Sequence, residues 1–207
     1  MNPELDLSQL LLTVDDVPRP WSAEQLYGRT APLEVEVGSG KGLFLETAAT
    51  ANPEHDFFGI EVAKKYARHC AARFAKRSLS NGRVLAGDGL WFFRDVLPHA
   101  SVAAVHVYFP DPWWKKRHRR RRVLNEPFLK DVTRVLVPGG HLHFWTDVQE
   151  YYESTLELIA EVTPLTGPEP VKVRPAEHDL DFHTHFERRT RLAGDPVYRC
   201  RYTKSSE

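Results

Sequence analysis

Cysteine is scarce in this sequence, with only Cys70 and Cys200 among 207 residues. The two residues show no Cys-x-x-Cys spacing and have no neighbouring histidine pair, so the sequence encodes neither a disulfide framework nor a zinc knuckle. A long apolar run is also missing, because no stretch approaches the ~20 residues that a membrane-spanning helix requires. Four acidic residues precede the first basic one, whereas a secretory signal begins with positive charge. These absences predict reduced thiols, a cytoplasmic location and no membrane partner.

An excess of either charge is missing as well, since 28 Lys and Arg residues balance 28 Asp and Glu residues. The balance hides a local block that we call the basic octet. Residues 115–122 read KKRHRRRR and hold seven fixed positive charges, which leaves 21 basic against 28 acidic residues elsewhere. Most charge runs are solvated segments or localisation signals. The octet instead lies mid-chain, after the apolar residues 102–109, and this position favours a phosphate-binding loop at the end of a core strand.

Short β-rich runs alternate with helical patterns between residues 33 and 162. The expected strands are residues 33–37, 57–61, 83–86, 102–109 and 141–146, and the expected helices are residues 43–50, 63–78, 90–96, 127–136 and 151–162, with a tight turn at 137–140. This alternation predicts an α/β fold with a mostly parallel, doubly wound sheet covered on both faces. Residues 171–174 and 197–202 are expected to form a terminal antiparallel strand pair. Residues 1–32 are interpreted as an irregular arm with one short helix, and residues 33–207 as a single domain with a basic loop at 110–122.

A glycine-rich turn follows the first of these strands, where the sequence reads EVEVGSGKGLFL. Gly38, Gly40 and Gly42 predict a strand-to-helix turn at which the backbone can approach a ligand closely. The third glycine comes one residue earlier than in the dinucleotide fingerprint, which argues against a nicotinamide-dependent oxidoreductase. A tight turn without a ligand remains an open alternative.

Acidic residues accompany three successive expected strands: Glu36 lies within the first, Glu61 ends the second and Asp88 follows the third. Because the carboxyl ends of parallel strands line the ligand crevice of an open sheet, these carboxylates are expected to converge on one site. They can bind ribose hydroxyls and face a positive amine or sulfonium, although each one singly could be a capping or solvated carboxylate. The crevice has no phosphate-binding Lys or Arg, which favours an adenosine cofactor without a pyrophosphate, most commonly S-adenosylmethionine.

The segment VYFPDPWWKKRHRRRR at residues 107–122 resembles the hallmark of the bacterial tRNA (guanine-N7)-methyltransferases. The similarity extends from about Leu33 to Tyr202 and includes EVEVGSGKG, FFGIEV, VPGGHLHFWTD and THFERR. The resemblance implies a Rossmann-like class I methyltransferase fold, S-adenosylmethionine as methyl donor, and methylation of a guanosine in the tRNA variable loop. Trp114 stands where the family usually has Pro, and His185 stands where it has Lys or Arg.

The resemblance also implies roles for individual residues. Cofactor contacts are expected from Glu36, Gly38, Gly40, Glu61, Asp88 and Asp111, with Asp111 as the catalytic residue at the reaction centre. Substrate contacts are expected from Lys115, Asp147, Thr184, His185, Phe186 and Glu187. RNA-backbone contacts are expected from Lys116, Arg117, His118, Arg119, Arg120, Arg121 and Arg122, and a second basic cluster comprises Arg188, Arg189 and Arg191.

Guanine N7 carries a lone pair and no proton, so its methylation requires positioning and exclusion of water but no general base. A fixed carboxylate such as Asp111 can stabilise the positive charge that moves onto the purine. Asp111 or Asp147 can also accept hydrogen bonds from the guanine Watson–Crick edge. The aromatic side chains of Phe109, Trp113 and Trp114 can stack on a splayed base.

Two alternatives remain open: a nonenzymatic RNA-binding protein on a degenerate methyltransferase fold, and a methyltransferase acting on another RNA base. A metal site is not expected, because the pairs His141/His143 and His183/His185 lack acidic or cysteine companions at ligand spacing. Cys70 is interpreted as a small buried residue. The sequence does not distinguish a monomer from a homodimer.

Overall fold

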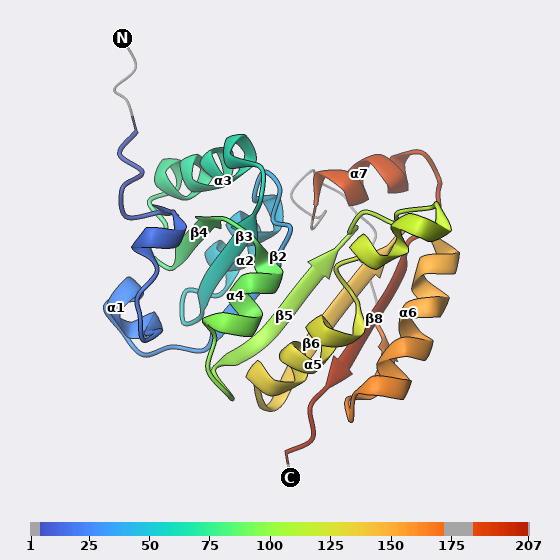
Figure 1. Cartoon of the computed structure of the whole chain (residues 1–207). Helices are drawn as coiled ribbons and strands as arrows, with labels where there is room; N and C mark the ends of the chain where they lie inside the picture. Colours follow the sequence, from blue (N-terminus) through green and yellow to red (C-terminus); the bar gives the residue numbers. More distant parts are fainter. Residues whose placement is uncertain (1–4, 172–183, 207) are drawn as a thin grey trace.

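The strands form one eight-stranded sheet in the order β1-β4-β3-β2-β5-β6-β8-β7 (Figure 1). The structure is a computed structural model that describes residues 5–171 and 184–206. The strands are β1 (Leu11–Leu12), β2 (Leu33–Val37), β3 (Asp56–Glu61), β4 (Gly82–Ala86), β5 (Val102–Tyr108), β6 (Leu136–Thr146), β7 (Thr166–Pro170) and β8 (Tyr198–Thr203). Neighbours from β1 to β6 pair in parallel, and β8 pairs antiparallel with both β6 and β7. The predicted parallel sheet with a terminal antiparallel pair is therefore confirmed.

Helices cover both faces of this sheet (Figure 1). The α-helices are α1 (Ala23–Tyr27), α2 (Leu43–Ala51), α3 (Lys64–Lys76), α4 (Gly89–Asp95), α5 (Glu126–Val135), α6 (Gln149–Val162) and α7 (His185–Leu192), and the 3-10 helices are η1 (Val14–Asp16) and η2 (Lys116–Arg121). Within the described part of the chain, no helix is both long and apolar enough to cross a membrane.

Alternation along the strands divides the core into two layers. On one face, apolar residues such as Val35, Val105 and Phe144 pack with α4, α5 and α6. On the other face, Phe57 and Trp145 belong to a smaller cluster with α2 and α3. Because both faces of the central strands are buried, the carboxyl edge of the sheet is left as the place where loops can form a site.

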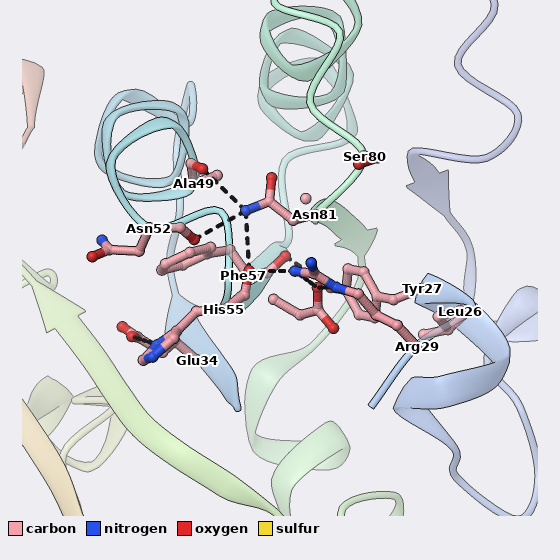
Figure 2. A network of polar contacts seen from close by, with 12 residues as sticks. Leu26, Tyr27, Arg29, Glu34, Ala49, Asn52, His55, Phe57, Ser80 and Asn81 are labelled. Atoms are coloured by element: carbon pink, nitrogen blue, oxygen red, sulfur yellow. Dashed lines mark hydrogen bonds and ion pairs between the residues drawn. The ribbon is translucent and has the colours of Figure 1, made fainter. Parts of the chain in front are cut away.

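A network of polar contacts ties the first helix to the opposite, amino-terminal edge of the sheet (Figure 2). The Arg29 guanidinium donates to the buried carboxylate of Asp56, with Nη2 2.7 Å from Oδ1, and to the carbonyl of His55. The Asn81 side-chain amide donates to the carbonyls of Ala49, Asn52 and His55. These contacts hold in place the loop that leads into β3. The loop lies at the edge of the sheet that is away from the candidate site.

Two elements differ from the sequence-based expectation. Residues 137–140 were expected as a turn, but they belong to β6, whose pairing with β5 is irregular between Val102 and Ala104. Gly139 there has φ +78°, and its N–H donates to the Lys204 carbonyl beyond β8. The strand that pairs with β8 at the edge of the sheet is β7 at Thr166–Pro170, where prolines are tolerated. Of the strand expected at 171–174, residues 172–174 lie outside the described residues.

The first described residues, 5–32, contain β1, η1 and α1. β1 forms the edge of the sheet and pairs in parallel with β4 through Leu11 and Leu12. Ser22 caps α1 by accepting a hydrogen bond from the Gln25 N–H. This segment therefore contributes a strand to the sheet in addition to the short helix expected from the sequence.

Candidate functional site

Two adjoining cavities lie at the carboxyl ends of the central strands. The first, which we call the carboxylate cavity, measures about 590 Å³ and is lined by Glu61, Asp88 and Asp111. The second, the glycine-turn cavity, measures about 570 Å³ and is lined by Glu36, Lys41, Arg188 and Arg189, so the expectation of a crevice without Lys or Arg is wrong. Both cavities share the lining residues Gly38, Gly40, Tyr66, Tyr108, Phe109 and Phe186. The two hollows are therefore parts of one crevice, at the edge of the sheet where the sequence placed the site.

The glycine turn between β2 and α2 has the backbone geometry of a ligand-approach loop. Gly38 and Gly40 have φ values of +82° and +54°, and an added Cβ at either position would meet nothing within 4 Å. Gly42 has a different function, because a Cβ there would lie 2.3 Å from Cys70 Sγ in α3. The third glycine thus allows close helix packing, whereas the first two leave open space beside the backbone.

Cys70 is fully buried at this contact, as expected for a small core residue. Burial raises the pKa of its thiol well above the usual range. A thiol that stays protonated is a poor nucleophile, so the structure gives Cys70 a packing role.

The carboxylates of the first cavity differ in how many hydrogen bonds they accept from the protein. Glu61 accepts from the N–H groups of Gly40 and Ala63, each at 2.8 Å, and so joins the glycine turn to the start of α3. Asp88 caps α4 by accepting from Leu90 N–H at 2.9 Å, although it is exposed. Asp111 is exposed on the cavity wall, and no hydrogen bond or ion pair joins it to another described residue. Each carboxylate keeps lone pairs for a ligand, because an ionised carboxylate can accept up to four hydrogen bonds.

Glu36 lies on β2 and is only 2% exposed on the wall of the glycine-turn cavity. Its Oε2 atom is buried and has no hydrogen-bond partner among the described residues. Burial, together with the nearby Glu61 carboxylate, raises the pKa of Glu36 well above its usual value. A buried carboxyl with an unpartnered oxygen on a cavity wall is suited to a positively charged ligand group.

Replacing Glu36 by Gln is expected to flatten the pH dependence of stability. A carboxyl with a raised pKa in the folded state binds more protons folded than unfolded, so stability falls as pH rises above its ordinary value of 4.5. In urea unfolding of the ligand-free protein, the variant should match the wild type near pH 4 and become increasingly more stable by about pH 8. Parallel stability curves for the two proteins would contradict this assignment.

Glu34→Gln is the control, because its expected effect on the pH dependence of stability has the opposite sign. Burial raises the pKa of Glu34, but hydrogen bonds from His106 and His55 outweigh that effect and lower the pKa overall. The ionised group therefore stabilises the fold at neutral pH and loses this contribution as pH falls. This variant should be less stable than the wild type at neutral pH and approach it in acid.

The loop after β5 forms the outer wall of the carboxylate cavity under backbone strain. Phe109 and Trp113 have φ values of +49° and +47°, in the left-handed region that non-glycine residues rarely adopt. Strain of this kind persists where the surroundings hold it, commonly at ligand sites. Trp113 lines the cavity and lies under the Arg121 guanidinium at 5.0 Å, whereas Trp114 is 66% exposed. The loop therefore presents one aromatic ring to the cavity and one to solvent.

The basic octet divides into exposed and buried members. Lys115, Arg117, Arg119, Arg120 and Arg121 are exposed, and the His118 ring lies edge-on to Trp113. Only the backbone of Lys116 is described. Arg119 pairs with Glu150 of α6, with Nη2 3.2 Å from Oε1. The octet thus presents an exposed cationic surface beside the cavity.

Arg122 is the buried member of the octet. Its guanidinium lies 4.3 Å over the Tyr151 ring, donates to the Pro112 carbonyl and pairs with Glu150 at 2.8 Å. Since these contacts hold it inside the protein, we assign Arg122 to anchoring the loop and do not include it among the RNA-backbone contacts.

Helix α7 covers the crevice, and the helix with its N-cap carries four of the expected substrate residues, Thr184, His185, Phe186 and Glu187. Thr184 caps the helix by accepting from Glu187 N–H at 2.9 Å, and it lines the glycine-turn cavity. Phe186 is 37% exposed, lines both cavities and lies 5.0 Å from the Phe109 ring. Glu187, in contrast, is fully buried and pairs with Arg199 at 2.9 Å and with Arg191 at 3.4 Å. The structure therefore brings Thr184 and Phe186 to the cavities and turns Glu187 toward the protein.

Two other expected substrate residues, Lys115 and Asp147, do not line either cavity. Lys115 is exposed at the start of η2, and Asp147 is half-buried after β6. His185 is the first residue of α7, and its side chain lies outside the described part of the structure. Among the described residues, no group of three His, Cys, Asp or Glu side chains is arranged to hold a metal ion.

The sequence analysis missed a hydrogen-bonded chain that reaches the cavity from the sheet. The Glu34 carboxylate accepts from His106 Nε2 at 2.7 Å, which leaves Nδ1 to accept from the Tyr108 hydroxyl at 2.8 Å. Burial raises the pKa of Tyr108 well above its usual value, so the hydroxyl stays protonated and can donate. Tyr108 lines both cavities, and this chain orients its ring. The alternation on β5, which puts His106 and Tyr108 on one face, is the signal that could have revealed it.

Solved structures with a similar fold are methyltransferases. The structure of an antibiotic-related methyltransferase matches with a TM-score of 0.62 at 15% identity, covering 87% of this chain and 91% of that one. A 16S rRNA methyltransferase matches with a TM-score of 0.61 at 21% identity, covering 88% and 92%. An O-methyltransferase from Thermotoga maritima matches with a TM-score of 0.57 at 16% identity, covering 86% and 61%. At these identities the similarity identifies the fold as the Rossmann-like methyltransferase fold.

Sequence comparison is more specific. The family described as "Putative methyltransferase" matches residues 30–200. A tRNA (guanine-N(7)-)-methyltransferase from Rhodopirellula baltica is 54% identical over 211 residues, covering 99% of this chain and 78% of that protein. The protein of the same name from Sodalis glossinidius is 35% identical over 204 residues, covering 97% and 84%. The chain therefore belongs to the tRNA (guanine-N7)-methyltransferase family.

Proposed function

We propose that this protein transfers a methyl group from S-adenosylmethionine to N7 of a guanosine in the variable loop of tRNA, and that it does so in the cytoplasm. The observation that carries the proposal is the crevice itself. Its wall combines the glycine turn, the carboxylates of Glu61, Asp88 and Asp111, and the strained aromatic loop that leads into the basic octet. Membership of the methyltransferase family supports the same reaction.

The residues of the crevice fit an adenosine cofactor with a charged amino-acid end. Glu61 and Asp88 would accept hydrogen bonds from its hydroxyl and amine donors, since both carboxylates keep free acceptor positions on the cavity wall. Glu36, with its unpartnered oxygen, would balance the positive amino group. Gly38 and Gly40 leave space for the ligand to lie against the backbone. When bound, the cofactor supplies a methyl group on a positively charged sulfur.

The protein's part in the reaction is positioning and charge stabilisation. The bound cofactor would supply the methyl group to guanine N7 and leave as a neutral thioether, and the protein need not remove a proton because N7 has none. Positive charge would move onto the purine, and Asp111 is a carboxylate on the cavity wall that can stabilise it. Phe186 and Trp113, which both line this cavity, provide rings on which a splayed base can stack.

The exposed octet residues would hold the RNA backbone beside the crevice. Arg117 and Arg120 are exposed on η2, at the end of the loop that carries Asp111. Such contacts release counterions from RNA and make affinity depend steeply on salt. A base delivered to the crevice would therefore be held by backbone contacts outside and by stacking inside.

The experiment that tests the function is methylation of unmodified tRNA transcripts with methyl-labelled S-adenosylmethionine, followed by cleavage specific for 7-methylguanosine. Label at a variable-loop guanosine is the expected result. Label at another guanosine N7 would retain the reaction and reject the proposed position, and label on a different base would favour a methyltransferase with another target. Tight, salt-sensitive tRNA binding without any label would instead favour a nonenzymatic RNA-binding protein.

A further inference from the structure

Helix α3 carries an excess of positive charge that the proposed reaction does not use. Between Glu61 and Asp88 the chain has seven Lys and Arg residues and no acidic residue. Six of the seven lie on α3 or at its C-cap: Lys64, Lys65, Arg68, Arg73, Lys76 and Arg77. A helix of this composition is basic over its whole length and has no acidic side chain of its own to form salt bridges along its surface.

The cations of α3 gather on its solvent side. Ala67, Cys70, Ala71 and Phe74 are buried against the sheet and α2, so they fix which side faces inward. The exposed basic residues are Lys64, Lys65, Arg68, His69, Lys76 and Arg77, which we call the α3 basic face. As in other amphipathic surface helices, the apolar side of α3 faces the core and the charged side faces solvent. A surface helix usually carries both positive and negative charges, whereas the charges of this face are all positive.

The basic face has an electrostatic cost in the isolated protein. Lys64 and Arg68 are four residues apart, as are Arg73 and Arg77, and like charges at this spacing destabilise a helix. Glu46 of α2 compensates part of it by pairing with Arg73 and Arg77. None of the ion pairs among the described residues includes Lys64, Lys65 or Lys76. An extended anion could pair with these three lysines.

The basic face continues into the crevice. A hollow of about 520 Å³ between α2 and α3 is lined by Lys41, Glu46, His69, Arg73, Lys76 and Arg77. Lys41 also lines the glycine-turn cavity, and its ammonium lies 5.7 Å from the Tyr66 ring of α3, which lines both cavities. Basic side chains therefore line both the candidate site and the hollow beside α3.

The opposite flank of the molecule restricts where a polyanion can lie. The exposed side of α6 carries Glu153, Glu157 and Glu161, and Figure 1 shows α6 on the far side of the sheet from α3. The octet segment η2 lies between the crevice and α6, and Glu150 of α6 pairs with Arg119 of η2. An RNA held by the octet would meet repulsion along α6 and attraction along α3.

We propose that the α3 basic face, together with Lys41, is a second phosphate-binding surface that holds the tRNA backbone on the side of the crevice opposite the octet. The proposal rests on the proposed function, because it takes tRNA as the substrate. It assigns to α3 a contribution to tRNA affinity and none to the chemical step, since the described residues that line the carboxylate cavity include no Lys or Arg of α3.

The test removes two charges that make no ion pair in the described structure, in the double variant Lys65→Gln/Lys76→Gln. We expect tRNA affinity to fall about tenfold, and the slope of log Kd against log salt to become shallower by about 2, one for each cation removed from a phosphate. In turnover with tRNA, KM should rise by a similar factor while kcat at saturating tRNA stays unchanged. Thermal unfolding should match the wild type, because both side chains are exposed.

The matched control is Arg94→Gln/Lys130→Gln, which removes two exposed cations from α4 and α5 on the other face of the sheet. This control should bind tRNA with wild-type affinity and slope. Equally weakened binding in both double variants would mean that net charge alone matters, and an unchanged slope in the α3 variant would mean that α3 touches no phosphate; either result overturns the proposal. Binding is measured without turnover, so a wild type that binds tRNA but methylates none would refute the proposed function while the α3 comparison still decides this inference.

Discussion

Replacing Asp111 by Asn should lower kcat for tRNA methylation by about 10²–10³-fold while leaving the protein as stable as the wild type. The size of the effect follows from the position of the carboxylate. Asp111 is on the wall of the cavity that also presents Glu61 and Asp88, so a negative charge there is fixed where positive charge would move onto the purine. Asparagine keeps the size and the acceptor oxygen but removes that charge. A preorganised charge acts on the transition state more than on the bound substrate, so kcat falls more than binding.

Stability should not change, because Asp111 supports nothing in the described part of the protein. The side chain is exposed, and no hydrogen bond or ion pair joins it to another described residue. The matched control is Asp15→Asn, which neutralises an exposed aspartate in η1, outside both cavities. Single-turnover rates with saturating tRNA and cofactor isolate the chemical step from binding and product release. A rate for the Asp111 variant within about twofold of the wild type would reject the charge argument, since removal of such a group ordinarily costs far more.

The fold could be predicted because its determinants are local in the sequence. β2 begins and ends at Leu33–Val37 as expected, because apolar alternation there is followed directly by the glycine turn. α5 was expected to begin at Pro127 and begins at Glu126, where Asn125 caps it by accepting from Phe128 N–H. β7 could not be found in the same way. Its sequence TGPEP has the composition of a loop, and only pairing with β8 makes it a strand.

The site was less predictable, because what a side chain does there depends on contacts distant in the sequence. The sequence placed the strand-end carboxylates correctly at one edge, since parallel topology alone brings strand ends together. It could not separate Glu36, buried and unpartnered, from the exposed Asp111. It also grouped Arg122 with its octet neighbours, although Tyr151 and Glu150 hold that side chain inside the protein. Membership of a charged run does not determine whether a residue faces solvent.

Replacing Glu187 by Gln should destabilise the protein, or α7 alone, by about 3–5 kcal/mol. Glu187 is fully buried, and its carboxylate pairs with the largely buried Arg199 and with Arg191. Glutamine keeps the shape and one acceptor oxygen, but it leaves the Arg199 charge in a poorly hydrated place without its counterion. Breaking a buried pair from one side is costly for this reason, whatever the net value of the intact pair. Urea unfolding measures a global loss, and amide hydrogen exchange of α7 measures a local one.

The double variant Glu187→Gln/Arg199→Gln tests whether the destabilisation arises from the unpaired charge. With both charges removed, neither member of the pair is left ionised and buried, so the double variant should be less destabilised than the sum of the two single variants. Arg191→Gln is the milder comparison, because the Arg191 guanidinium lies farther from Glu187, at 3.4 Å against 2.9 Å for Arg199. Additive effects would indicate that Glu187 and Arg199 act independently and that the ion pair does not hold α7.

The Glu187→Gln variant also distinguishes between two roles for Glu187, which the family resemblance places at the substrate. A side chain that contacts guanosine directly would leave stability unchanged and alter turnover alone. Glu187 instead faces β8, while Thr184 and Phe186 at the start of the same helix line the crevice. If Glu187 anchors α7, its replacement releases Phe186 from its position against Phe109, so KM for tRNA rises together with hydrogen exchange in the helix. Stability and substrate binding should therefore change together in Glu187→Gln, whereas in Asp111→Asn only turnover changes.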